Sequence, residues 1–98
     1  MTCSVIYPPT LDWAWLTQRP QQLMRQFARH GYPTYFCNLT QRPGLPPEPA
    51  GPNLWVVHDH RAFVAGGLPD GPRLVWCSWP KLHDTLDLYR SAAVVFDA

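Results

Sequence analysis

Five short runs of apolar, β-branched and aromatic residues recur along the chain, and each is bounded by proline, glycine or polar residues. This pattern is typical of short β-strands separated by turns. The fourth run is almost continuously apolar, as expected for a strand that is covered on both faces. The sequence predicts strands at residues 3–7, 33–38, 54–58, 73–78 and 92–96.

Helical spacing appears between these runs. From Thr17 the apolar positions recur every three to four residues, with Thr17 as the N-cap and Gly31 as the stop. A second helix is expected from about 80 to 90, where Leu82, Leu86 and Tyr89 form one stripe. Residues 59–65 are expected to form a short helical turn that Gly66 and Gly67 break.

Strands that alternate with helices predict an α/β domain with an open, parallel, Rossmann-like sheet. We expect the strand order 3-2-1-4-5 with flanking helices, in one domain covering residues 1–98. Residues 39–52 hold five of the twelve prolines and are expected to be an extended connection. No helix follows the last strand, so we predict a fragment of a larger protein that self-associates through an uncovered face.

The composition excludes several classes of function. The chain is 46% hydrophobic and 15% charged with a formal net charge of +1, which indicates a globular protein with no electrostatic preference for nucleic acid. Neither a signal peptide nor a membrane-length apolar run is present, so we expect a cytoplasmic location or one at the inner face of the membrane. Cys3, Cys37 and Cys77 are widely spaced, which favours reduced thiols over a metal site.

The loops after the first and fourth strands carry the candidate chemistry, because ligands bind at the carboxyl ends of parallel strands. Tryptophans could present flat apolar faces to a sugar ring, and an amide and a guanidinium near a helix N-terminus could bind an anionic group. Alternatively, the tryptophans plug the top of the sheet and the arginine forms a surface ion pair. The candidate substrate-binding residues are Trp13, Trp15, Gln18, Arg19, Trp79 and Asp97.

The segment His58-Asp59-His60-Arg61 invites a catalytic or metal-binding interpretation, because histidine titrates near neutral pH. It lacks a matching ligand pair and a nucleophile, which favours a polar loop after the third strand. The glycine-rich motifs of dinucleotide and nucleoside triphosphate sites are absent as well. We therefore assign no catalytic residue, no metal and no bound cofactor.

Residues 13–38 read WAWLTQRPQQLMRQFARHGYPTYFCN. This segment resembles the amino-terminal part of bacterial glycosyltransferases with the GT-B fold, in the group that includes teichuronic-acid-type transferases. The element Gln18-Arg19-Pro20-Gln21 after the tryptophans carries most of the resemblance. The segments at 74–80 and 94–97 resemble the fourth and fifth strands of that family.

The resemblance implies the acceptor-side domain of an enzyme that transfers a sugar from a nucleotide-sugar to a glycan or a lipid-linked acceptor. The family binds the donor in a carboxyl-terminal domain, which this chain does not include, so we expect the chain to be inactive alone. Cleft-facing roles for Trp13, Gln18 and Arg19 follow from the same resemblance. The alternative is a non-catalytic, flavodoxin-like module that binds a glycan or a protein.

Overall fold

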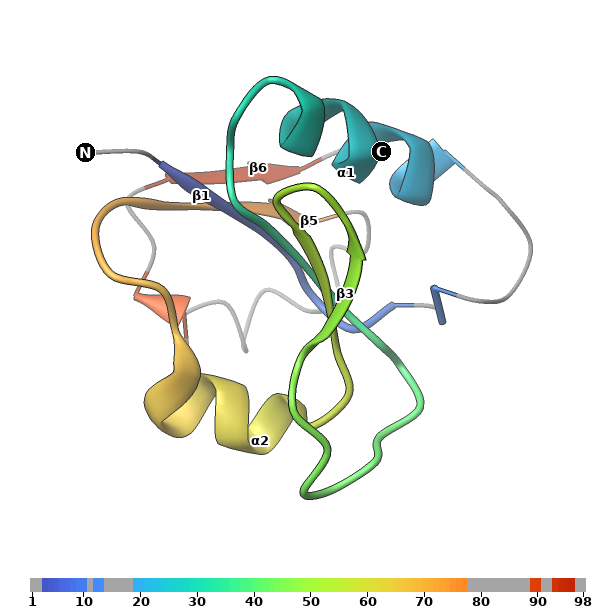
Figure 1. Ribbon diagram of the computed structural model, residues 1–98. Helices are drawn as coiled ribbons and strands as arrows, with labels where there is room; N and C mark the ends of the chain where they lie inside the picture. The colour runs from blue at the N-terminus through green and yellow to red at the C-terminus, as the bar shows by residue number, and fades with distance from the viewer. Residues whose placement is uncertain (1–2, 11, 14–18, 78–88, 91–92, 97–98) are drawn as a thin grey trace.

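A six-stranded, mostly parallel sheet with helices on both faces forms the centre of the computed structural model (Figure 1). The structure describes residues 3–10, 12–13, 19–77, 89–90 and 93–96, without the side chains of residues 19 and 96. The sheet order is β3-β4-β2-β1-β5-β6. The strands are β1 (Ser4–Tyr7), β2 (Thr34–Cys37), β3 (Glu48–Gly51), β4 (Leu54–Val57), β5 (Arg73–Cys77) and β6 (Ala93–Phe96).

This order differs from the predicted one because a further strand, β3, lies at the edge of the sheet. β3 comes from the proline-rich segment that we expected to be an extended connection, and it pairs antiparallel with β4. Pro49 is compatible with this position, since an edge strand needs ladder hydrogen bonds on one side only. The register shifts between Pro49 and Gly51, and such an irregularity limits further pairing at the open edge.

The other strand pairs are all parallel. β1 pairs with β2 and with β5, β2 pairs with β4, and β5 pairs with β6. The carboxyl ends of these five strands therefore meet at one edge of the sheet, which we call the carboxyl edge. Val94 on β6 is 36% exposed. The self-association that we expect from the sequence stays a prediction.

Helix α1 (Arg19–Arg29) packs on one face of the sheet. Gln21, Met24 and Ala28 are buried and follow one another at helical spacing, so they form the face that meets the strands. The helix ends at Gly31, as predicted. Gly31 has a φ of 91°, its N–H donates to the carbonyl of Ala28, and the N–H of Tyr32 donates to Phe27, which together form a Schellman motif.

The opposite face is covered by α2 (His60–Ala62), which continues into a wider helical turn, η1 (Phe63–Gly67). The sequence predicted this turn, but Gly66 and Gly67 do not break it. Phe63 is 4% exposed and anchors the turn in the core, and the chain becomes extended only at Leu68. The predicted helix at 80–90 falls outside the described residues except for its last two positions.

Alternate residues of each strand enter one of two cores. The core under α2 and η1 contains Ile6, Cys37, Val57, Phe63, Val75, Cys77 and Tyr89. The core under α1 contains Val5, Tyr7, Met24, Ala28, Phe36 and Leu54, with Trp13 packed at its margin. The strand period of two residues therefore places neighbouring side chains on different faces of the sheet.

The three cysteines are reduced thiols that form no disulfide, as predicted. Cys37 and Cys77 are buried and Cys3 is half-buried, and burial raises the pKa of the Cys37 thiol well above its usual range. We expect a thiol reagent at neutral pH to modify Cys3 in the native protein and to leave Cys37 and Cys77 unmodified until unfolding. Peptide mass mapping after brief labelling checks this, and rapid native modification of Cys37 would contradict the burial.

Candidate functional site

The loops that follow β1, β2 and β4 converge at the carboxyl edge. Asp12 and Trp13 lie in the loop after β1, Asn38 directly follows β2, and His58 directly follows β4. Their hydrogen bonds join segments that are 20 to 28 residues apart in sequence. This edge is where parallel α/β sheets bind ligands.

The side-chain amide of Asn38 links the loops after β1 and β4. Its Oδ1 accepts the backbone N–H of Trp13 at 2.8 Å, and its Nδ2 lies 3.3 Å from Nδ1 of His58. Because the Trp13 amide can only donate, the oxygen of Asn38 faces Trp13 and its NH₂ group faces the imidazole. Nδ1 of His58 is therefore the acceptor in this contact.

His58 extends this chain of hydrogen bonds to the edge strand. Its Nε2 lies 3.2 Å from Oε1 of Glu48 on β3, and a carboxylate can only accept. The neutral imidazole with its proton on Nε2 satisfies both contacts at once. His58 is 7% exposed, so this arrangement pairs its ring nitrogens within a nearly closed environment.

A second connection between loops is formed by Asp12 and Thr40. The carboxylate accepts the backbone N–H of Thr40 at 2.7 Å and its hydroxyl at 2.6 Å. The hydroxyl donor of Thr40 is the main cause that holds the pKa of Asp12 below its usual value, and its backbone N–H adds to this. Asp12 thereby fixes the approach of the chain to Trp13.

Because the pKa of Asp12 is lowered, the contribution of this group to the stability of the folded protein depends on pH, and the direction of that dependence follows. The carboxylate form is favoured in the folded state, so the stabilisation is present above the ordinary pKa of the group and is lost as the pH falls through the lowered value. We expect Thr40→Val to raise the pKa of Asp12 toward that of a free aspartate. A carboxyl NMR titration of both proteins checks this, and equal titration curves would refute the contact.

The indole of Trp13 is half-buried, and one aromatic ring and one cation contact it. Its ring lies edge-on to Phe36 with centroids 5.1 Å apart, and the guanidinium of Arg25 lies 5.1 Å from its centroid. Trp13 also packs against the core under α1, so it covers part of this end of the sheet, as the alternative interpretation predicts. A half-exposed, anchored indole can also offer a rigid apolar surface to a ligand.

Tyr7 ends β1 beneath this site. Its ring stacks on Phe36 with centroids 4.9 Å apart, and its buried hydroxyl has no hydrogen-bond partner within the described part of the chain. Tyr7→Phe removes an unsatisfied group without changing the ring, so we expect a free energy of unfolding equal to or above that of the wild type. Denaturant unfolding measures it, and a loss of about 1 kcal/mol or more would reveal a partner for the hydroxyl.

The polar residues after β4 form hydrogen bonds with other segments of the chain. Asp59 caps α2 by accepting the N–H of Ala62, and it also accepts the N–H of Gly44, which lowers its pKa. Nε2 of His60 lies 2.6 Å from the hydroxyl of Tyr89, and burial lowers the pKa of His60. These contacts give the segment a structural role.

Of the six candidate residues, the structure describes Trp13 in full and Arg19 by its backbone alone, at the start of α1. The site that forms around Trp13 includes Asp12, Asn38, Thr40 and His58, which the sequence analysis did not select. The available signal was that Asn38 and His58 end predicted strands and that Asp12 and Thr40 lie in the loops that follow predicted strands. The candidates outside the described residues are Trp15, Gln18, Trp79 and Asp97.

Within the described ranges, no three histidine, cysteine, aspartate or glutamate side chains are grouped as metal ligands would be. No helix there is both long and apolar enough to cross a bilayer. Comparison of the chain with protein-family models, with curated proteins and with solved structures found no match.

Proposed function

We propose that this chain is the acceptor-side domain of a GT-B glycosyltransferase, acting in cell-envelope polysaccharide synthesis, and that it binds a glycan or lipid-linked acceptor at the carboxyl edge. A separate carboxyl-terminal domain binds the nucleotide-sugar and completes the enzyme. The observation that carries this proposal is the anchoring of Trp13 at that edge by Asn38, within the segment whose sequence resembles the family.

The arrangement supports the proposal in two ways. The sheet is parallel through β4, β2, β1, β5 and β6, which is the kind of scaffold that the resemblance implies. The half-exposed indole of Trp13 is held by Phe36 and Arg25 before any ligand binds, so little side-chain freedom is lost on stacking against the C–H groups of a sugar.

The described residues support binding and orientation of an acceptor. Trp13 provides the apolar surface, the carboxylate of Asp12 precedes it in the chain, and that of Glu48 is connected to it through His58 and Asn38. The side chain of Glu48 is 67% exposed, so its second oxygen can accept a sugar hydroxyl while the first contacts His58. Arg19 begins α1, and the positive end of the helix dipole there favours an anionic group of the substrates.

Sugar binding by the ¹⁵N-labelled protein tests this proposal. We expect methyl glycosides of glucose, galactose and N-acetylglucosamine to shift the NMR signals of Trp13, Asn38 and Thr40. Trp13→Ala should weaken the tightest of these interactions about tenfold or more, and Trp13→Phe should weaken it less.

Tyr32→Ala is the matched control. Tyr32 is an aromatic residue that is 42% exposed, and it precedes the amino end of β2, opposite to the carboxyl edge. Its loss should leave the affinity unchanged. Absence of sugar-induced shifts at the carboxyl edge, or equal affinities of Trp13→Ala and wild type, would contradict the proposal.

A further inference from the structure

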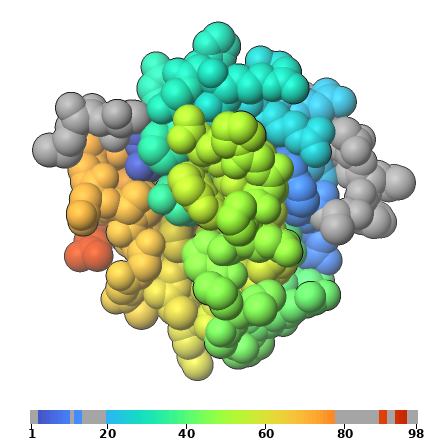
Figure 2. Space-filling view, in the orientation of Figure 1, coloured from blue at the N-terminus to red at the C-terminus, as the bar shows by residue number. Residues whose placement is uncertain are grey.

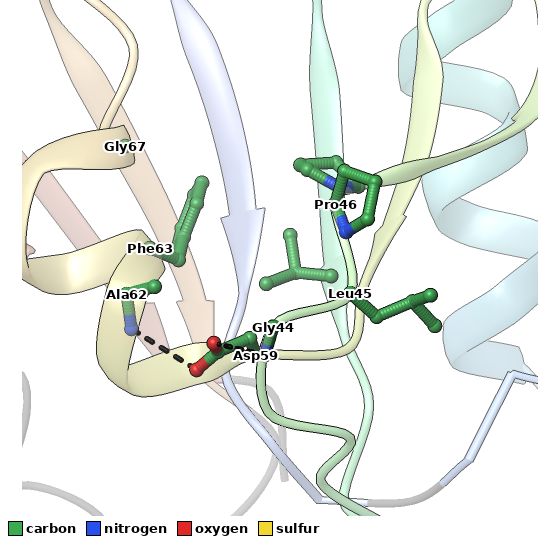
Figure 3. A pocket seen from close by; sticks show the side chains of 9 residues that line it. Gly44, Leu45, Pro46, Asp59, Ala62, Phe63 and Gly67 are labelled. Carbon is green, nitrogen blue, oxygen red and sulfur yellow. Dashed lines mark hydrogen bonds between the residues drawn. The ribbon is translucent and has the colours of Figure 1, made fainter.

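An apolar cavity of about 260 Å³ lies between the loop after β2 and the helical turn after β4 (Figure 3). Leu45 and Pro46 approach it from the loop, and Phe63 points toward it from η1 (Figure 3). Val57 and Phe63 are almost fully buried at its base. The same loop and turn are the green and yellow residues in the lower part of the space-filling view (Figure 2).

A second hollow, which is also lined mainly by apolar surface, adjoins this cavity and shares Asp59 and Ala62 with it. It has a volume of about 400 Å³, and its other residues include Gln41 and Arg61. Both oxygens of Asp59 already accept a backbone N–H, yet each keeps a lone pair for another donor. Arg61 adds guanidinium donors beside this acceptor.

Both hollows offer carbon-rich surfaces, and they differ in their charged side chains. Asp59 lies at the boundary that they share, and Arg61 lines the second hollow alone. Opposite charges side by side give no net preference for a charged head group, but they supply an acceptor and donors for hydroxyl groups. The pair suits an uncharged molecule with an apolar end and a hydroxylated end.

We propose that this double hollow binds such an amphiphile, with its alkyl or aryl group in the apolar cavity and its hydroxylated head against Asp59 and Arg61. The cavity is slightly smaller than most ligand pockets, so the group it holds is short or is only the first part of a longer chain. Identification of this amphiphile as the sugar acceptor rests on the proposed glycosyltransferase function.

Two neighbouring glycines provide a matched pair of variants. A Cβ at Gly67, which lines the cavity, meets only ordinary contacts at 3.6 and 3.7 Å, so we expect a leucine to be accommodated there with its side chain in the cavity. A Cβ at Gly66, which does not line the cavity, meets nothing within 4 Å. Gly67→Leu therefore blocks the cavity, and Gly66→Leu carries the same added side chain outside it.

The experiment compares n-hexyl β-D-glucoside, below its micelle-forming concentration, with methyl β-D-glucoside by NMR titration. We expect the hexyl chain to tighten binding about tenfold or more in the wild type and in Gly66→Leu, and to give no gain in Gly67→Leu. Ala62→Leu, a second change that fills the cavity, should behave like Gly67→Leu. Melting curves of all variants establish that they are folded.

Equal affinities for the two glucosides in the wild type would overturn this inference, as would a hexyl gain that persists in both Gly67→Leu and Ala62→Leu. If methyl glucoside still shifted the signals of Trp13, the proposed function would stand without the apolar site. Conversely, hexyl glucoside shifts at Phe63 and Gly67, with no shift at Trp13 from either glucoside, would support the cavity and contradict the proposed acceptor site.

Discussion

Phe36→Ala is expected to reduce the free energy of unfolding by about 3–5 kcal/mol, the usual cost of truncating a buried phenylalanine. Phe36 is fully buried on β2, and it contacts both Tyr7 and Trp13 through its ring. Its loss leaves a cavity in the core under α1 and removes the support of the indole. A small domain is stable by only about 5–15 kcal/mol, so this loss is a large fraction of the total.

Denaturant unfolding followed by circular dichroism measures this effect. Phe36→Leu is the control, because it keeps an apolar side chain and should retain much of the stability while still removing the ring contacts with Trp13. In both variants we expect the NMR signal of the Trp13 indole to move. A loss below about 1 kcal/mol in Phe36→Ala would show that this core does not carry the site.

Asn38→Ala is expected to reduce the free energy of unfolding by about 1–3 kcal/mol. The change removes the side-chain amide that forms hydrogen bonds with both Trp13 and His58. The Trp13 N–H loses its acceptor, and Nδ1 of His58, which is buried, loses its donor. The loop after β1 then loses its hydrogen bond at Trp13 and keeps the connection between Asp12 and Thr40. We expect faster hydrogen exchange of the Trp13 amide and weaker sugar binding, in addition to the lower stability.

Asn38→Asp separates the two contacts. Aspartate still accepts the Trp13 N–H but cannot donate to His58, so the Nε2-protonated imidazole loses its partner at Nδ1. We expect slow exchange of the Trp13 amide to persist in this variant and the ¹⁵N shifts of the His58 ring to change. Unaltered ring shifts in Asn38→Asp, together with unaltered amide exchange in Asn38→Ala, would show that Asn38 does not join these loops.

Local sequence patterns were sufficient for much of the scaffold. The apolar runs at β1, β2, β4, β5 and β6, the helical spacing of α1 and the stop at Gly31 all depend on near neighbours in the chain. The edge strand β3 could not be predicted in this way. Its residues are rich in proline and mostly exposed, and they form a strand only because β4 offers an unpaired edge beside them.

The candidate site was less predictable for the same reason. The contact of Asn38 with His58 requires that β2 and β4 be neighbours, and the contact of His58 with Glu48 requires β3, which was not foreseen. The rule that ligands bind at the carboxyl ends of parallel strands selected the loop that carries Trp13, and ligand binding there stays a prediction. Applied to every strand, it would also have selected Asn38 and His58.

Sugar transfer by a protein that combines this domain with the proposed donor-binding domain tests the central claim most directly. We expect release of nucleoside diphosphate from at least one nucleotide-sugar to depend on an added glycan or lipid-linked acceptor. Trp13→Ala should raise the acceptor concentration needed for half-maximal release about tenfold or more, and Tyr32→Ala should not change it. Acceptor binding at Trp13 without turnover of any nucleotide-sugar would contradict the claim and indicate a glycan-binding module instead.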